Sequence, residues 1–343
     1  MNNKILFLAL TLISILLWSF RQIEEPTILK FRAPKKWPDP EYDFRKNPIT
    51  LEGFELGRKL FYDPILSRDS TISCASCHLQ YTGFAHVDHK LSHGIDGKKG
   101  TRNAPALINL AWNSNFHWDG GVNHIEVQAL NPIQHPAEMD SKLVDVIARL
   151  QRSKTYPELF ARAFGSSEIT VSRLMKAITM FDLELVSANS KYDQVMRKDK
   201  GVAFTEQEEK GLELFREHCE MCHTEPLFTN SFFANVGLPI DPELNDVGRY
   251  SITHDPTDSL LFKIPTLRNI EFTFPYMHDG RFKKLMEVIN FYSSEIDPSA
   301  KNLHPSLRFR KNFTDNEKKD ILAFLYTLTD KEFLFNKRFS FPK

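Results

Sequence analysis

Two copies of one short cysteine motif constrain this chain more than any other feature. The sequence reads "CASCH" at residues 74–78 and "CEMCH" at residues 219–223, and these copies use all four cysteines of the 343-residue chain. A redox dithiol motif needs two cysteines but no fixed histidine. A structural zinc site could take the four cysteines as thiolate ligands. Neither alternative explains why a histidine follows the second cysteine in both copies.

Covalent haem attachment explains that histidine. Two sulfurs bond to the two vinyl groups of haem, and the adjacent imidazole reaches the iron. The sequence therefore predicts two c-type haems, with His78 and His223 as axial iron ligands. The attachment residues would be Cys74, Cys77, Cys219 and Cys222.

The N-terminus predicts export. Lys4 precedes an apolar run from Ile5 to Phe20, so residues 1–22 read as a signal sequence or, if uncleaved, an N-terminal anchor. We expect a periplasmic protein, because c-type haem is attached outside the cytoplasm. Residues 23–45 are rich in proline and charge and predict an extended leader. The 44 basic and 44 acidic side chains balance, so no global field favours nucleic acid.

An internal repeat predicts the architecture. "GRKLF" precedes the first motif and "GLELF" the second, and each half closes with an amphipathic pattern, at residues 172–188 and 316–330. We expect an all-α fold with little strand, made of two tandem cytochrome c-like domains at 46–200 and 201–343, each with one covalent haem. Five positions recur at an offset of 160 residues: Pro105, Leu107, Asn109, Asp119 and Gly120 return as Pro265, Leu267, Asn269, Asp279 and Gly280.

The same offset addresses the sixth iron ligand, which decides between electron transfer and peroxide binding. It sets Pro132 of the first half against Tyr292 of the second. Proline cannot coordinate iron, whereas tyrosine can as phenolate. A slip of one residue would set Asn131, also a poor ligand, against Tyr292. Tyr292 could instead be a packed core residue, and Met277 and Met286 are competing ligands.

An open first haem that cleaves an O–O bond needs a proton shuttle. The stretch "VQALNPIQHPAEMD" offers Gln128, Gln134, His135 and Glu138. We expect Glu138 as the acid–base and Gln128 as a hydrogen-bond partner of peroxide, although Glu138 could equally cap the next helix.

Other side chains of the first half could also reach its iron or carry electrons. His86, His89 and His93 could swing onto the iron, and His93, beside a glycine, is the best of them. Trp118 could pass electrons or only pack.

Together these motifs resemble the bacterial di-haem cytochrome c peroxidase family, which includes the MauG-type enzymes. The similarity runs from about residue 47 to residue 329, through "LFYDPILSRDSTISCASCH", "GTRNAPALINLAWN", "FHWDGG", "CEMCHTEPLF" and "FKIPTLRNIEFTFPYMHDGRF". The resemblance implies that His78 serves a peroxidatic haem and His223 an electron-transfer haem. Gln128 and Glu138 match a distal glutamine and a catalytic glutamate, and Trp118 matches a tryptophan between the haems.

The resemblance also implies a calcium ion and a departure at the second haem. Asn103, Thr273 and Pro275 match residues that bind Ca²⁺ between the domains, partly through backbone carbonyls. His93 falls near a histidine that ligates the resting peroxidatic haem. Similar peroxidases place methionine at the second haem, where this chain looks like MauG with Tyr292.

Three functions remain open on the sequence. The first is a periplasmic peroxidase that reduces H₂O₂ to water at the His78 haem, with electrons from a small cytochrome or a cupredoxin arriving through the His223 haem. The second is a MauG-like oxidase of a protein or small molecule. The third is a non-enzymatic electron carrier. We expect no nucleic-acid partner, and a homodimer is an open alternative to the monomer.

Overall fold

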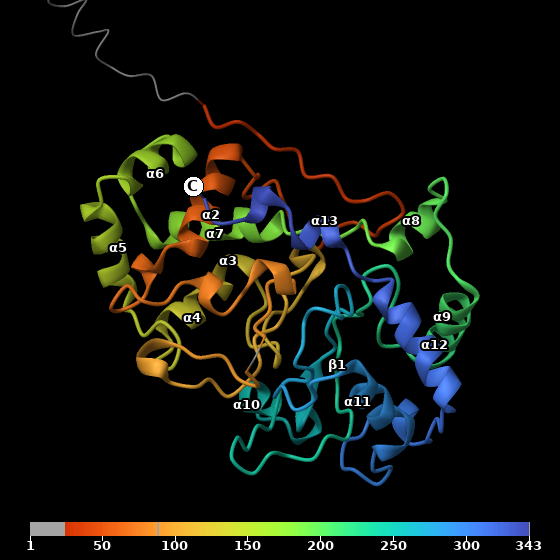
Figure 1. Cartoon of the computed structure of the whole chain (residues 1–343). Coiled ribbons are helices and arrows are strands. Elements are labelled where there is room, and N and C mark those ends of the chain that lie inside the picture. The colour runs from red at the N-terminus through yellow and green to blue at the C-terminus, as the bar shows by residue number, and fades with distance from the viewer. Residues whose placement is uncertain (1–24, 88, 343) are drawn as a thin grey trace, which may run out of the picture.

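The computed structural model describes residues 25–87 and 89–342, which form two mainly helical halves (Figure 1). Helix α2 (Leu51–Tyr62) packs against α7 (Val171–Leu183) in the first half. In the second half, α9 (Glu206–His218) packs against α12 (Asp315–Tyr326). Strand in the described residues is limited to β1 (Phe233–Ala234) and β2 (Phe262–Lys263), which pair antiparallel. The prediction of an all-α fold with little strand is confirmed.

Shorter helices surround the two pairs. Their bounds are α3 (Ile125–Gln128), α4 (Leu130–Gln134), α5 (Leu143–Arg152), α6 (Tyr156–Phe164), α8 (Lys191–Arg197), α10 (Tyr250–Thr253), α11 (Leu285–Asn290) and α13 (Lys331–Leu334). A π-helix (Phe291–Glu295) follows α11 directly. No helix in the described part of the chain is long and apolar enough to cross a membrane. The predicted signal or anchor at 1–22 lies outside the described residues.

A threonine starts each helix of the two pairs. Thr50, Thr170, Thr205 and Thr314 are the N-caps of α2, α7, α9 and α12, and each side chain accepts a hydrogen bond from a backbone amide in the first turn. Such a bond satisfies an amide that would otherwise lack a partner. At α9 and α12 a glutamate in the first turn completes a capping box.

The repeated glycine of "GRKLF" and "GLELF" lies where the two helices of each pair touch. A Cβ atom added to Gly57 would lie 1.9 Å from the carbonyl oxygen of Ala177, and one added to Gly211 would lie 2.0 Å from that of Asp320. These separations are far below van der Waals contact, so only glycine allows the helices to approach this closely. The glycine that recurs in the sequence therefore marks the same close helix contact in both halves.

The closing helices are shorter than their amphipathic patterns predicted. Helix α7 ends at Leu183 and α12 at Tyr326, because the chain beyond each helix turns to bind the repeated asparagine of its own half. Asn109 N donates to Leu185 O at 2.9 Å, and Asn269 N donates to Leu328 O at 3.0 Å. Both asparagines have positive φ, 57° and 58°. Long-range bonds thus end helices that local periodicity would extend.

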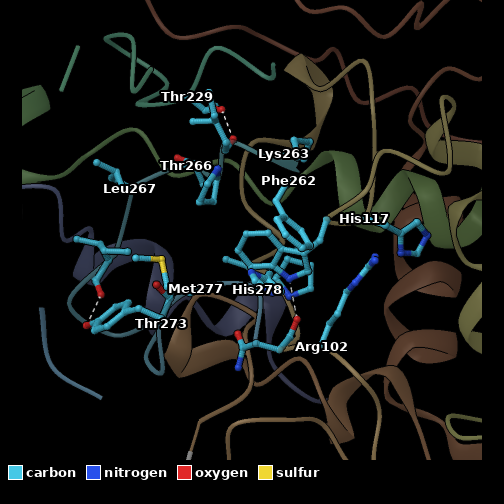
Figure 2. Close-up of a pocket in the computed structure, with 18 of the residues that line it drawn as sticks. Arg102, His117, Thr229, Phe262, Lys263, Thr266, Leu267, Thr273, Met277 and His278 are labelled. Atoms are coloured by element: carbon cyan, nitrogen blue, oxygen red, sulfur yellow. Dashed lines mark hydrogen bonds between the residues drawn. The ribbon is translucent and has the colours of Figure 1, made fainter. Parts of the chain in front are cut away.

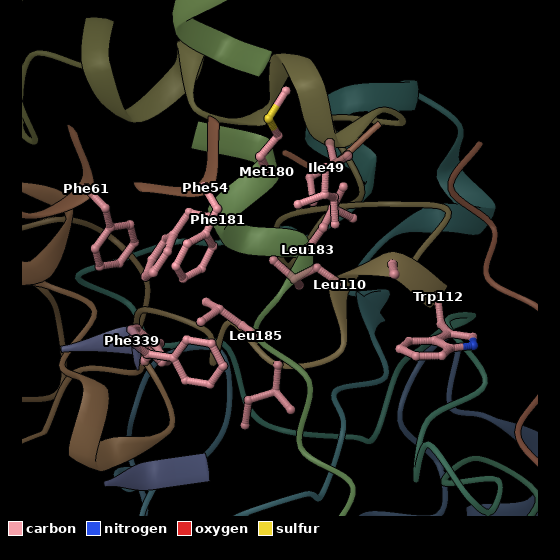
Figure 3. Close-up of a cluster of buried hydrophobic side chains, with 14 of the residues drawn as sticks. Ile49, Phe54, Phe61, Leu110, Trp112, Met180, Phe181, Leu183, Leu185 and Phe339 are labelled. Carbon is pink, nitrogen blue, oxygen red and sulfur yellow. The ribbon is translucent and has the colours of Figure 1, made fainter. Parts of the chain in front are cut away.

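The C-terminal segment returns to the first half. In Figure 1 the C-terminal end, marked C, lies beside α2. Phe333, Leu334 and Phe339 are buried in one core cluster with Phe54 and Phe181 (Figure 3). The predicted domain boundaries at 46–200 and 201–343 stay a prediction, but this segment packs across them. The leader is extended without being detached, because its aromatic side chains, among them Trp37 and Phe44, pack on the same cluster.

We expect Gly211→Ala to destabilise the second half. In an exposed helix this change would stabilise by up to about 1 kcal/mol through helix propensity. Here the new Cβ overlaps the backbone of α12, and overpacking of this kind costs about 1–3 kcal/mol. Denaturant unfolding should therefore show a lower free energy of unfolding. The exposed Glu213 of the same helix provides the control, and Glu213→Ala should change that free energy by less than about 0.5 kcal/mol. A stabilised Gly211→Ala would refute the close packing.

Candidate active site

Both cysteine motifs fold into the same tight turn. In the first, the amides of Cys77 and His78 donate to Cys74 O at 3.1 and 2.9 Å. In the second, the amides of the last cysteine and the histidine donate to the carbonyl of the first cysteine, again at 3.1 and 2.9 Å. Each turn thus gathers two sulfurs and one imidazole in a short loop.

Backbone carbonyls fix the orientation of both motif histidines. His78 Nδ1 lies 2.6 Å from Phe84 O, and His223 Nδ1 lies 3.2 Å from Phe228 O and 3.1 Å from Pro265 O. These carbonyls accept the Nδ1 proton, which leaves the lone pair of Nε2 for a metal. Burial lowers the pKa of each imidazole to about 4, so both rings are neutral near pH 7.

The thiols do not suit the two alternatives to haem. Burial raises the pKa of Cys74 and Cys219 to about 12 and that of Cys77 to about 11. A reactive dithiol needs a lowered thiol pKa instead. In the described ranges, no group of three or more His, Cys, Asp or Glu side chains could hold a metal ion, so the four cysteines do not form a zinc shell.

One cavity joins both motifs. Its volume is about 870 Å³, and residues of both halves line it, including His78 and His223. Figure 2 shows part of this lining. Three of the four motif cysteines, Cys77, Cys219 and Cys222, also line it. A buried space that presents two neutral imidazoles and the paired thiols fits two covalently bound haems, held through His78 and His223.

The predicted distal residues of the first half line this cavity. Gln128 ends α3, Pro132 lies on α4, and Glu138 lies in the turn before α5. The N-cap of α5 is Lys142, so the alternative that Glu138 caps this helix is wrong.

Backbone contacts hold Glu138 in place. Ile95 N donates to Glu138 O at 2.7 Å, and Glu138 N donates to His135 O at 3.0 Å. A Cβ on Gly94 would lie 2.5 Å from Glu138 Cα, so this glycine lets the loop at 92–97 press against the turn. Burial raises the pKa of Glu138, and His135 Nδ1, 3.6 Å from the carboxylate, opposes that rise.

Tyr292 lies on the π-helix and lines the cavity with His223. Burial is the main cause that raises the pKa of Tyr292, and the thiols of Cys222 and Cys219 raise it further. No hydrogen bond joins its hydroxyl to another described residue. At the offset of 160, residues 130–134 of α4 correspond to residues 290–294, and the π-helix (Phe291–Glu295) covers all but the first of these. The equivalence of Pro132 and Tyr292 stays a prediction. Single π-helical turns are frequent at functional sites.

Of the two competing methionines, the structure brings one to the cavity. Met277 lines it, whereas Met286 does not. Met277 is therefore the better placed competitor of Tyr292, and the identity of the sixth ligand stays a prediction. Met277 has φ 73°, and His117, at the equivalent position of the first half, has φ 64°. The backbone repeats although the side chains differ.

Trp118 is fixed at the junction of the halves by a reciprocal exchange. Lys263 N donates to Trp118 O at 2.7 Å, and Asn103 N donates to His278 O at 2.7 Å. The two donors, Asn103 and Lys263, lie 160 residues apart in the sequence, and so do the two acceptors, Trp118 and His278. In addition, Trp118 Nε1 donates to Asn103 O at 2.8 Å. Trp118 is therefore held through both its backbone carbonyl and its indole ring.

An ion-pair clamp supports the same junction. Arg102 of the first half donates two hydrogen bonds to Asp246 of the second, at 2.6 and 2.8 Å, and also pairs with Asp119 beside Trp118. Phe262 stacks on His278 with ring centroids 3.7 Å apart, as Figure 2 shows. The clamp keeps the two halves in register around Trp118.

The remaining predicted residues are divided between the cavity and its surroundings. Asn103, Thr273 and Pro275 line the cavity at the junction, as do Gln134 and His135. His86, His89 and His93 do not line it. The His89 and His93 rings lie 4.6 Å apart, and His93 O accepts from Cys77 Sγ at 3.5 Å. An approach of His93 to the iron would need its loop to move.

Sequence reasoning missed two cavity residues. His117 Nε2 is buried and has no hydrogen-bond partner among the described residues. Lys263 also lines the cavity, and burial lowers the pKa of its amine to about 8. The offset of 160 could have found both, because it aligns His117 with Met277 and Lys263 with Asn103.

Comparisons with known proteins agree with this geometry. The family model for di-haem cytochrome c peroxidase matches residues 51–201. The chain is 34% identical over 286 residues to the cytochrome c551 peroxidase of Nitrosomonas europaea, which covers 82% of this chain and 81% of that protein. The chain belongs to the di-haem cytochrome c peroxidase family. Its membership confirms the family prediction and the prediction of two c-type haems.

Two further relatives lie on the MauG side of this family. The methylamine utilization protein MauG of Methylorubrum extorquens is 34% identical over 308 residues, covering 87% of this chain and 83% of that protein. A crystal structure of a MauG-like protein associated with microbial copper homeostasis superposes with a TM-score of 0.82 at 33% identity, covering 92% of this chain and 99% of the other. The di-haem peroxidase BthA of Burkholderia thailandensis, at 22% identity and a TM-score of 0.74, covers 94% of this chain and 97% of its own and shares the fold.

Haem content tests the attachment residues. We expect two covalent haems per chain, and we expect the double change Cys219→Ala and Cys222→Ala to leave one, because the second motif then has no sulfur to form a thioether. The pyridine haemochrome spectrum per mole of protein measures this. Glu220→Ala, between the two cysteines, should retain both haems. Release of haem from the denatured wild type into acidified organic solvent would contradict covalent attachment.

Replacement of Tyr292 tests the sixth ligand of the second haem. We expect Tyr292→Phe to change the ferric absorption and electron paramagnetic resonance spectra, because phenyl cannot coordinate iron. The second haem should then bind added cyanide or take Met277 as its ligand. Met277→Leu should leave the wild-type spectrum intact. The reverse pattern, an unchanged Tyr292→Phe and an altered Met277→Leu, would assign the ligand to methionine.

Proposed function

We propose that this protein is an exported di-haem peroxidase that reduces H₂O₂ to water in its first half and receives the electrons through its second half. The observation that carries the proposal is the position of Glu138. Glu138 lines the same cavity as His78 and Pro132, and proline offers no ligand to iron. An open iron site beside a held carboxyl is what peroxide reduction needs, and an electron carrier has no use for it.

Glu138 supplies the proton movement of the reaction. Reduction of H₂O₂ to two molecules of water takes up two electrons and two protons. The haem irons supply the binding place and the electrons. Glu138 accepts the proton of the oxygen that binds and returns it to the oxygen that leaves. Gln128 holds the peroxide by hydrogen bonding from the end of α3.

The surroundings of Glu138 suit a group that both accepts and donates a proton. Burial raises its pKa from the usual range of a glutamate towards the working pH, while His135 limits the rise. A general acid–base works best when its pKa lies near the operating pH. Two backbone hydrogen bonds, from Ile95 N to Glu138 O and from Glu138 N to His135 O, hold the main chain of Glu138 without using its carboxylate oxygens.

Tyr292 favours a second candidate, a MauG-like oxidase. A phenolate ligand stabilises ferric iron and lowers its potential, which makes the second haem a poor acceptor from ordinary cytochromes. The protein would then share oxidising equivalents between both halves and Trp118 and withdraw electrons from another protein or a small molecule. Catalytic consumption of a reduced small cytochrome or cupredoxin by H₂O₂ would favour the peroxidase, and its absence the oxidase.

Three finer features belong to this proposal. We place the protein in the periplasm, because haem attachment through cysteine motifs takes place there. We assign a calcium ion to Asn103, Thr273 and Pro275, supported by their common position at the junction and by the preference of Ca²⁺ for oxygen ligands. We keep His93 as a ligand of the resting first haem, reached by movement of its loop.

Glu138→Gln tests the proton shuttle. Glutamine fills nearly the same volume but cannot cycle a proton, so the reaction with H₂O₂ should slow by about a hundredfold or more. Both haems should stay attached with near-normal spectra. Because Glu138 accepts a proton only when ionised and its pKa is raised, the wild-type rate should fall with acidification at a higher pH than a free glutamate would give. Glu138→Gln should lose this pH dependence.

Stopped-flow rates across pH, beside thermal melts, measure these effects. The exposed Glu168 provides the matched control, and Glu168→Gln should keep the wild-type rate and its pH profile. A fast Glu138→Gln would remove this residue from the mechanism.

A further inference from the structure

One surface segment carries an unbalanced positive charge. Residues 298–314 contain four basic side chains and no carboxylate, although the whole chain has 44 of each sign. Arg308, Phe309 and Arg310 are exposed at its centre, and Lys301 is exposed before them. Phe309 is 79% exposed, more than any other large hydrophobic side chain of the described residues. We call Lys301, Arg308, Phe309, Arg310 and Lys311 the basic loop.

The charges of the basic loop are not neutralised by neighbours. Within the described ranges, no ion pair joins any of its four cations to a carboxylate, and Arg310 acts on Asp297 only as a minor influence that lowers its pKa. Three other arginines of the described residues are in ion pairs: Arg102 with Asp246, Arg216 with Glu225 and Arg268 with Asp193. The basic loop is therefore a local positive field on a neutral protein.

The basic loop lies at the mouth of the second motif. Lys311 and the adjoining Phe313 line the cavity. Cys219 lines the same cavity, and the positive charge of Lys311 opposes the rise in the pKa of this thiol that burial causes. The Phe313 ring lies 5.1 Å from the ring of His218, which directly precedes Cys219.

The residues that follow the basic loop are bonded to the π-helix that carries Tyr292. Asn312 N donates to Ser293 O at 2.9 Å, and Phe313 N donates to Ser293 Oγ at 2.9 Å. Ser293 follows Tyr292 on the π-helix. The basic loop thus spans the edge of the second haem site, between its attachment turn and its proposed sixth ligand.

We propose that the basic loop is the docking surface of an acidic redox protein that exchanges electrons with the second half. Arginine and exposed aromatic side chains are enriched in the centres of protein interfaces. Complementary charge steers such partners together and fixes their orientation. Two molecules of the partner dock in turn, each is oxidised by one electron, and together they supply the two electrons that one H₂O₂ takes up. The assignment rests on the proposed function, in which a partner protein gives up electrons.

The test uses the haem-loaded full chain and two probe proteins. Dithionite-reduced protein is mixed with an oxidised acidic cupredoxin or with an oxidised basic cytochrome c, and the second-order rate constant is measured as ionic strength rises. We expect the acidic probe to react faster at low salt and to slow as salt screens the charges. Arg308→Glu with Arg310→Glu should slow that reaction about tenfold or more at low salt. Phe309→Ser should slow it without changing the salt dependence.

The control has the same change of charge elsewhere. Arg152 of α5 and Arg162 of α6 are exposed in the first half, and Arg152→Glu with Arg162→Glu should behave as the wild type. Equal rates and salt dependence in the wild type and the Arg308/Arg310 variant would overturn the proposal, as would a faster reaction with the basic probe. If the Arg308/Arg310 variant lost only its binding to phosphatidylglycerol vesicles, the loop would be a membrane contact and the proposal would fail.

A second readout separates this proposal from the proposed function. Turnover of H₂O₂ with a small uncharged phenolic donor does not need protein docking, so the Arg308/Arg310 variant should keep it. If the Arg308/Arg310 variant keeps H₂O₂ turnover with the phenolic donor and also reacts with the cupredoxin as the wild type does, the docking surface is refuted and the peroxidase function is not. No turnover in the wild type, with the salt-dependent cupredoxin reaction intact, would refute the peroxidase and leave the docking surface in place.

Discussion

The reciprocal pair of backbone hydrogen bonds at the junction is the constraint on which the rest of the site depends. Asn103 and Lys263 each donate to the carbonyl of a residue in the opposite half, His278 and Trp118, at the same distance. Because the bonds are related by the repeat, they place the two motif turns in one cavity rather than in two separate ones. They also fix Trp118 between the halves. Loss of this register would separate the two redox sites even if each half stayed folded.

Within this repeated frame, the two halves differ at the positions that we predict to face the irons. The close helix pairs at Gly57 and Gly211 and the motif turns are nearly the same in both. The distal positions differ, with Pro132 on α4 and Tyr292 on the π-helix. Pro132 has no atom that could coordinate an iron held by His78, whereas the Tyr292 hydroxyl could coordinate one held by His223. Duplicated packing with divergent distal residues is thus the basis of the proposed division between peroxide chemistry and electron transfer.

Charge is also divided between the two ends of the cavity. The first half presents Glu138, a carboxyl whose pKa burial raises, where protons must move. The second half presents Lys311 at the cavity and the exposed cations of the basic loop beyond it. A proton-handling end and an electron-receiving end can then be exposed to different solutes. The zero formal charge of the chain hides this division, because it appears only when the charges are placed in space.

The sequence by itself determined the features that depend on local spacing or on the repeat. Two cysteines and a histidine in five residues specify haem attachment, and the offset of 160 sets Pro132 against Tyr292. Tertiary structure decided what depends on long-range packing. It brought Met277 and not Met286 to the cavity, showed that Glu138 is no helix cap, and packed α13 on the first half. It also placed Lys311 of the basic loop at the cavity and bonded the residues that follow it, Asn312 and Phe313, to the π-helix. Spacing along the chain cannot tell which of two side chains of the same type reaches the cavity. Burial and distance to the cavity depend on how segments far apart in the sequence pack together.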